Sequence, residues 1–238
     1  AALADAVMFP LYLSQLSFFK ELCSALKARF PEKPLIIGGP VPSAVPAEAL
    51  NFLRADHAVI GEGELSVVPL LDAVLGRGGP GLAAIGGIAY RENGAVKTNP
   101  PGQLLESLDA LPFPDYSLWK DPGAFSTPFS IGISSVRGCS GQCGFCSKIM
   151  SRPRIKSPGR FEAELVHLKD RYGIKAVTLN DPHLSGGLPG ASELCGIFGK
   201  HAVSYFCFLR VTDVTRDLAA RLKETGCYGV YVGVESYN

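Results

Sequence analysis

The sequence predicts an α/β protein in two parts: a Rossmann-like, doubly wound layer over residues 1–98 and a partial βα barrel over residues 131–238. Three observations predict this fold. Short apolar runs alternate with segments whose apolar residues recur every three or four positions, as in sheets whose parallel strands are connected by helices. Residues 99–130 are rich in proline and lack periodicity, which is typical of a connection between domains. Four further strand–helix steps follow in the second part.

The composition excludes several classes of protein. Of the 238 residues, 47% are hydrophobic and the net charge is +1, so buried cores are expected and no strong field draws the chain to nucleic acid or membranes. No apolar run approaches the roughly 18–20 residues of a transmembrane helix. Seven cysteines, three of them clustered, make a poor disulfide framework and indicate a reducing cytoplasm. We expect Cys23, Cys195, Cys207 and Cys227 to be buried as small core hydrophobes.

The first part alternates strands and helices. In residues 14–30, for example, Leu16, Phe19, Cys23 and Leu26 recur at helical spacing. The expected strands are 6–13, 35–37 and 57–60, and the expected helices are 14–30, 46–54 and 65–75.

An antiparallel edge should complete this layer. Two strand-like runs, residues 85–90 and 95–98, flank Asn93 and Gly94. An Asn-Gly pair between two apolar runs is a strong hairpin signal.

Two glycine motifs follow the second and third expected strands: Gly38 with Gly39, and Gly61, Glu62 and Gly63. Ligands of open α/β sheets bind at the carboxyl ends of the strands, and glycine lets a ligand approach the backbone closely. Alternatively, these residues form tight turns only.

The second part repeats the strand–helix alternation after the connection. Four aromatic residues of the connection, Phe113, Tyr116, Trp119 and Phe125, are expected to pack on a surface. Gly226 is expected to end the last helix in the left-handed conformation. The expected strands are 130–136, 175–180, 203–211 and 228–234, and the expected helices are 161–172, 191–198 and 215–225.

The most informative motif is a cysteine triplet, Cys139, Cys143 and Cys146, directly after the first strand of the second part. A structural zinc ion is bound by four protein ligands, and a fully ligated iron–sulfur cluster is bound by four cysteines. Three thiolates leave one metal position open, which favours chemistry at that position. An electron-transfer or cluster-carrier protein is the second hypothesis. A zinc-stabilised binding module is disfavoured because no fourth ligand lies near the triplet.

Charged residues end the next three strands: Asp181, Arg210 and Glu235. In barrels of parallel strands the carboxyl-end face carries the active site, so these groups should meet the cysteines at one rim. Each alone has a structural alternative, since Asp181 suits a turn and Arg210 with Glu235 suits an ion pair. Of the histidines, His183 and His201 are expected to be surface or capping residues, and His57 and His167 have no evident partner.

The cysteine spacing, with Phe145 directly before the last cysteine, resembles the signature of the radical S-adenosylmethionine (SAM) superfamily. The later motifs that resemble it are 154–164, 179–181, Arg210, Gly226 and 233–236. Three upstream segments resemble the subgroup with an N-terminal cobalamin-binding domain: 36–40, 59–64 and 111–116.

The resemblance implies a mechanism. The three cysteines would ligate three irons of a 4Fe–4S cluster, and SAM would chelate the fourth iron. One electron would then split SAM into methionine and a 5′-deoxyadenosyl radical. A small-molecule substrate and a reductant such as flavodoxin or ferredoxin are implied, with methyl transfer or cyclisation as the reaction.

The resemblance also implies binding residues for both cofactors. The implied SAM contacts are Phe145, Asp181, Arg210, Glu235 and Ser236. Gly38, Gly39, Gly61, Glu62 and Gly63 would contact cobalamin.

Two departures from the family pattern stand out. Many cobalamin domains of the family carry an Asp-x-His-x-x-Gly segment that can ligate cobalt, and this sequence has none, so cobalamin binding is left open. The barrel supplies four strand–helix units where the family core has six. Since the sequence begins without Met and ends directly after a strand, we expect a fragment cut at both ends.

Overall fold

The computed structural model describes residues 4–118, 131–146, 152–184 and 190–236. It divides into two compact units, Ala1–Leu105 and Glu106–Asn238, and the boundary lies inside the Pro-rich stretch 99–130. Both units are α/β, as predicted. Nowhere in the described part of the chain is a helix long and apolar enough to span a bilayer.

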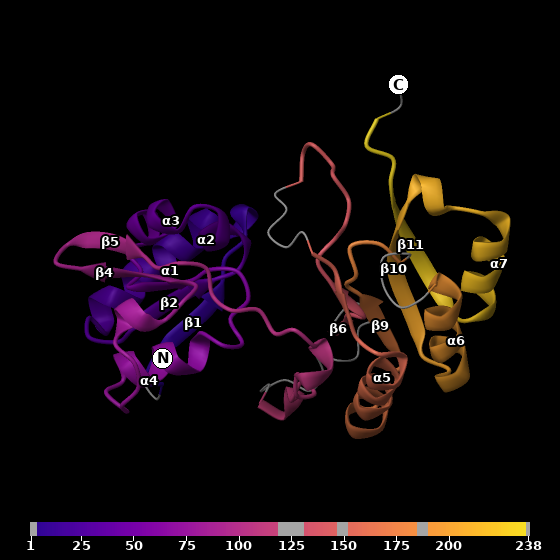
Figure 1. Ribbon diagram of the computed structural model, residues 1–238, viewed down its shortest axis with the longest axis horizontal. Coiled ribbons are helices and arrows are strands. Elements are labelled where there is room, and N and C mark those ends of the chain that lie inside the picture. Colours follow the sequence, from indigo (N-terminus) through magenta and orange to yellow (C-terminus); the bar gives the residue numbers. More distant parts are fainter. Residues whose placement is uncertain (1–3, 119–130, 147–151, 185–189, 237–238) are drawn as a thin grey trace. The chain divides into compact units, whose positions relative to one another are not determined.

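The first unit contains one five-stranded sheet in the order β1-β2-β3-β4-β5 (Figure 1). Strands β1 (Val7–Pro10), β2 (Leu35–Gly38) and β3 (His57–Val59) are parallel. Strands β4 (Ile88–Glu92) and β5 (Ala95–Thr98) continue the sheet antiparallel. The predicted parallel layer with an antiparallel edge is therefore confirmed.

Both faces of this sheet are buried, as the all-apolar β2 predicts. Leu35 and Ile37 pack into a core with residues of α1 (Leu16–Arg29) and α3 (Pro46–Leu53). The intervening Ile36 belongs to a second core that includes Leu70 of α4 (Val67–Val74).

A short helix, α2 (Pro40–Ala44), was not predicted. Gly39 has a φ of 89°, a conformation that favours glycine, and Pro40 then suits the first position of a helix. The hairpin prediction holds, since Asn93 and Gly94 both have positive φ, as a type I′ turn requires.

The second unit contains a four-stranded sheet in the order β11-β10-β9-β6, all parallel. Its strands are β6 (Gly132–Ile133), β9 (Ala176–Leu179), β10 (Ser204–Arg210) and β11 (Cys227–Gly233). Each strand lies beside the next in sequence, as expected for successive right-handed crossovers. All four carboxyl ends therefore lie at one edge.

Three helices cover one face of this sheet: α5 (Pro158–Tyr172), α6 (Ala191–His201) and α7 (Arg216–Glu224) (Figure 1). Burial alternates along β10, with Tyr205, Cys207 and Leu209 in the core beneath the helices. Cys23, Cys195 and Cys207 are fully buried and Cys227 is half-buried, in line with their predicted role as core residues. Gly226 has positive φ after α7, as predicted.

The single strand predicted over residues 130–136 is wrong, because the structure has two short strands there, β6 and β7 (Val136–Arg137). After β6 the chain leaves the sheet, and β7 pairs antiparallel with β8 (Arg154–Ile155). β8 was not predicted, because two residues are too few to show a period. The reason for the break is Asp181, whose carboxylate accepts hydrogen bonds from the backbone beyond β6.

The aromatic residues of the connection pack on α5, as predicted, where the structure describes them. Phe113 stacks on His167 at 4.9 Å between ring centroids, and Tyr116 contacts Tyr172 edge-on. The expectation that His167 lacks a partner is therefore wrong. Trp119, Phe125 and Ser130 lie outside the described residues.

Replacing Gly87 by alanine should destabilise the first unit. Gly87 has a φ of 71°, and an added Cβ would lie 3.0 Å from the backbone of Gly102. Strain and clash together should cost about 2–3 kcal/mol, measured as a lower urea midpoint. Gly81→Ala is the control, since that φ is −62° and an added Cβ meets nothing within 4 Å. Equal midpoints for the two variants would contradict the prediction.

Candidate functional site

The cysteine triplet lies on a long loop between the paired strands β7 and β8, which we call the cysteine loop (residues 138–153). The structure describes it at 138–146 and 152–153. The loop therefore starts and ends at one small antiparallel ladder, in which Arg137 pairs with Arg154.

All three thiols of the triplet are free. Cys139 is half-buried, whereas Cys143 and Cys146 are exposed and linked by a turn in which Cys146 N–H donates to Cys143 O at 3.1 Å. Within the described ranges, no three His, Cys, Asp or Glu side chains are placed to hold a metal ion. The three-cysteine metal site thus stays a prediction from the spacing.

Arg210 reaches the cysteine loop from the carboxyl end of β10. Its Nη2 lies 3.5 Å from Cys139 Sγ. A Cβ at Gly141 would lie 2.8 Å from the same Nη2, so the glycine leaves room for the guanidinium. The predicted meeting of the cysteine motif with the end of the third strand is confirmed for this pair.

His183 also lies beside the loop, which was not predicted. It is buried, with Nδ1 3.6 Å from Asp213 Oδ2, so its assignment as a surface or capping residue is wrong. Burial, together with the Arg210 guanidinium, holds the pKa of His183 below its usual value, against the effect of Asp213. The available signal was its position two residues after Asp181. A narrow cavity here is lined by Gly138, Cys139, Ser140, Pro153, Pro182 and His183.

The other rim residues lie in different settings. Asp181 is buried and bonded to Ser135 and Val136, and a contact with SAM stays a prediction. Glu235 is exposed and has a φ of 60°, which is uncommon for a residue other than glycine. Among the described residues no ion pair joins Arg210 to Glu235.

Phe145 and Ser236 lie on the surface in this structure. Phe145 is 72% exposed, and Ser236 is exposed directly after Glu235. Their predicted contacts with SAM are not tested by this arrangement.

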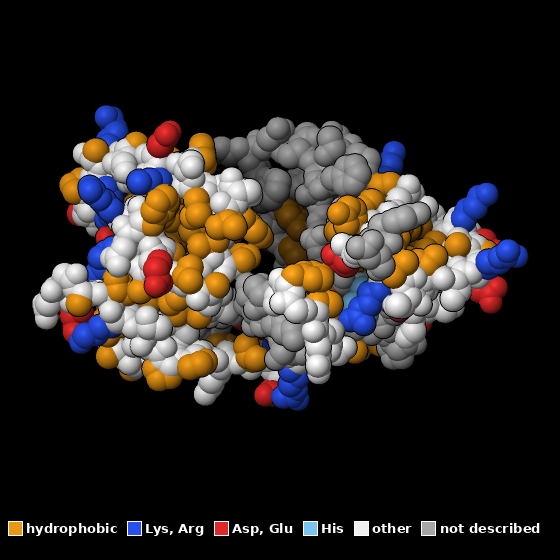
Figure 2. Space-filling view, turned by 90° about the horizontal axis from the view of Figure 1, so that it is seen from above, with side chains coloured by type: hydrophobic (Ala, Val, Ile, Leu, Met, Phe, Trp, Pro, Cys, Tyr) orange, Lys and Arg blue, Asp and Glu red, His pale blue; other side chains and the backbone are white. Residues whose placement is uncertain are grey.

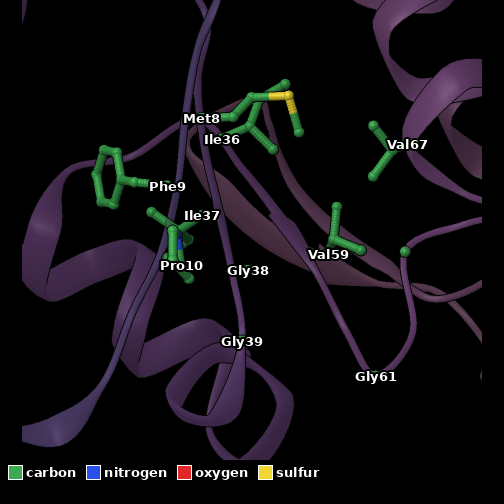
Figure 3. A pocket seen from close by; sticks show the side chains of 11 residues that line it. Met8, Phe9, Pro10, Ile36, Ile37, Gly38, Gly39, Val59, Gly61 and Val67 are labelled. Atoms are coloured by element: carbon green, nitrogen blue, oxygen red, sulfur yellow. The ribbon is translucent and has the colours of Figure 1, made fainter. Parts of the chain in front are cut away.

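The first unit has a separate pocket of about 290 Å³ at the carboxyl ends of β1, β2 and β3 (Figure 3). Figure 3 shows Met8 and Val67 on opposite sides of it, with Gly38, Gly39 and Gly61 at its edge. The lining residues are Met8, Phe9, Pro10, Ile36, Ile37, Gly38, Gly39, Val59, Gly61, Gly63 and Val67.

Four of the five predicted cobalamin contacts line this pocket, and Glu62 does not. An added Cβ at Gly61 would meet nothing within 4 Å, so that part of the backbone is open to a ligand. The lining side chains are all apolar, and none of them is a His, Cys, Asp or Glu. Hydrophobic side chains also gather on the surface of this unit in Figure 2.

Comparison with known proteins gives a domain family and several relatives. Residues 1–71 match the B12 binding domain family. An uncharacterized methyltransferase of Pyrococcus horikoshii, PH0819, is 32% identical over 213 residues, which cover 85% of this chain and 45% of that protein. Cytidylyl-2-hydroxyethylphosphonate methyltransferase of Streptomyces wedmorensis is 25% identical, covering 87% of this chain and 45% of its own. The chain spans less than half the length of these relatives.

Two solved structures share the fold over nearly the whole chain. The radical SAM methyltransferase TsrM of Kitasatospora setae, solved with tryptophan and a SAM analogue, has a TM-score of 0.77, 15% identity, and coverage of 98% of this chain and 49% of its own. OxsB, a cobalamin-dependent SAM radical enzyme solved with aqua-cobalamin and SAM, has a TM-score of 0.74, 18% identity, and coverage of 99% and 36%. At these identities the likeness concerns the fold alone.

Proposed function

Because the chain has the fold of cobalamin-dependent radical SAM enzymes and begins with a B12-binding domain, we propose that it is part of such an enzyme and that the reaction is methyl transfer. The observation that carries this proposal is the contact between Arg210 and Cys139 at the carboxyl edge of a parallel sheet. Methyl transfer is favoured over cyclisation because the relatives are named methyltransferases.

The residues of the cysteine loop fit an iron–sulfur cluster by the chemistry of their donors. Three free thiols lie within eight residues, and two of them are exposed. Iron–sulfur clusters are held by cysteine thiolates, and the missing fourth ligand leaves one iron for SAM. Arg210, beside Cys139, would suit the SAM carboxylate because a guanidinium pairs well with a carboxylate. Glu235, two residues beyond β11, would suit the ammonium group or the ribose hydroxyls.

The pocket of the first unit fits one edge or face of cobalamin. Its lining is apolar, and its glycines expose the backbone at the carboxyl edge, where ligands of such sheets bind. None of the lining side chains is a histidine, so these residues would hold the macrocycle by van der Waals contact. When bound, the cluster would supply the electron that splits SAM, and cobalamin would carry the methyl group. A small-molecule substrate and a one-electron reductant such as flavodoxin or ferredoxin complete the proposal.

Anaerobic reconstitution should give about four irons per chain, as a 4Fe–4S cluster requires. Changing Cys139, Cys143 and Cys146 together to alanine should abolish iron binding and the formation of 5′-deoxyadenosine from SAM under reduction. Iron analysis and chromatography of the products measure both. Cys23→Ala removes a buried cysteine of the other unit and should leave the iron content unchanged.

Two results would count against this proposal. Full iron content in the triple variant would place the cluster elsewhere. A wild-type chain that binds the cluster without cleaving SAM would point instead to an electron-transfer or cluster-carrier protein.

Val67→Arg should weaken cobalamin binding, because it places a charge in an apolar pocket. We expect a loss of at least about tenfold in affinity, or about 1.4 kcal/mol, measured by equilibrium dialysis with hydroxocobalamin. Val68→Arg is the matched control, since Val68 is the next residue of α4, is 62% exposed and does not line the pocket. Equal affinities for the two variants would place cobalamin outside this pocket.

A further inference from the structure

The cysteine loop is fixed at both ends by buried polar contacts that the proposed function does not explain. Within its described part, two hydrogen bonds support the loop locally, from Gly141 N–H to Cys139 Sγ and from Cys146 N–H to Cys143 O. Arg210 adds one contact from the core, with Cys139 Sγ. The other described supports come from the segments that carry the loop, which are residues 134–137 before it and 154–156 after it.

The first contact holds the incoming segment. The Asp181 carboxylate accepts hydrogen bonds from Ser135 N–H at 2.8 Å, from Val136 N–H at 3.1 Å and from Ser135 Oγ–H. Asp181 is 2% exposed and follows the end of β9. Its bonds thus tie the segment before the loop to the carboxyl end of a core strand.

The second contact holds the returning segment. Lys156 Nζ lies 2.6 Å from Glu164 Oε2 of α5, and these side chains are 8% and 6% exposed. Another ion pair that involves α5, between its Glu162 and Lys200 of α6, is far more exposed, at 28% and 67%. Charges resist removal from water, so a buried pair adds little to stability over an apolar pair of similar volume. The burial of the Lys156–Glu164 pair is better explained by a role in positioning the segment that follows the cysteine loop.

The two contacts are joined through one residue. Ser135 donates to Asp181 and accepts a hydrogen bond at its carbonyl from Lys156 N–H at 2.8 Å. The end of β9, both ends of the cysteine loop and α5 therefore form one connected polar network. We call Ser135, Lys156, Glu164 and Asp181 the loop clamp.

We propose that the loop clamp positions the cysteine loop for cluster binding, so that its four residues act on the cluster through the loop and do not touch it. This inference rests on the proposed function, because it takes the cysteines as cluster ligands. It differs from the role that the family resemblance implies for Asp181, which is a direct contact with SAM.

The test uses variants that separate position from stability. Lys156→Met with Glu164→Leu removes the buried pair without leaving one charge unpaired, and this replacement should leave the melting temperature near that of the wild type. Asp181→Asn and Ser135→Ala each weaken the contact between the Asp181 carboxylate and the segment before the loop. Ser135→Ala is the milder change and serves if Asp181→Asn does not fold. Lys200→Met, which removes the exposed lysine partner of Glu162 and leaves its contact with His201, is the control.

Two readouts follow on the full chain. In the reconstituted protein, clamp variants should release iron to a chelator about tenfold faster or more, because changing residues that orient metal ligands typically lowers metal affinity by about 10–100-fold. In the iron-free protein, amide hydrogen exchange across residues 138–146 should accelerate in the clamp variants and stay at the wild-type rate in Lys200→Met.

Unchanged exchange and unchanged iron release in folded Lys156→Met/Glu164→Leu and Ser135→Ala would overturn the inference. Failure of the proposed function is a distinct result: the wild-type chain would then take up no iron. The exchange measurement on the iron-free chain would still decide whether the clamp holds the loop.

Discussion

Parallel strand pairing is the constraint on which both units depend. In each sheet it sends the carboxyl ends of the parallel strands to one edge, because each connection between parallel strands returns over a face of the sheet. In the first unit this edge forms an apolar pocket among glycines at the ends of β1, β2 and β3. In the second it brings Arg210, at the end of β10, to Cys139.

The two edges differ in chemistry as their proposed ligands do. The first offers apolar side chains and open backbone, which suit a large flat cofactor held by contact area. The second offers thiols, a guanidinium and a buried histidine paired with an aspartate, which suit a charged ligand and a metal cluster. The two proposed sites therefore lie at equivalent edges of their sheets, one of them apolar and the other polar.

Polar groups at the carboxyl edge of the second unit differ in what they contact. Asp181 ends a strand as Arg210 does, yet its carboxylate bonds to the backbone of Ser135 and Val136. Burial raises the pKa of Asp181, while these hydrogen bonds and Lys156 lower it, so the carboxylate depends on its partners. If the cysteine loop holds a cluster as proposed, these hydrogen bonds would support it from the core behind it.

The sequence by itself determined the α/β alternation, the hairpin at Asn93 and Gly94, and the cysteine spacing, because each depends on local periodicity, turn geometry or residue type. Only the tertiary structure decided that His183 is buried near Cys139 and that Asp181 supports the loop. Ser135 and Asp181 are 46 residues apart, and no local pattern encodes a hydrogen bond over that separation. Such contacts exist only once β6 and β9 pair, because pairing brings the two segments together.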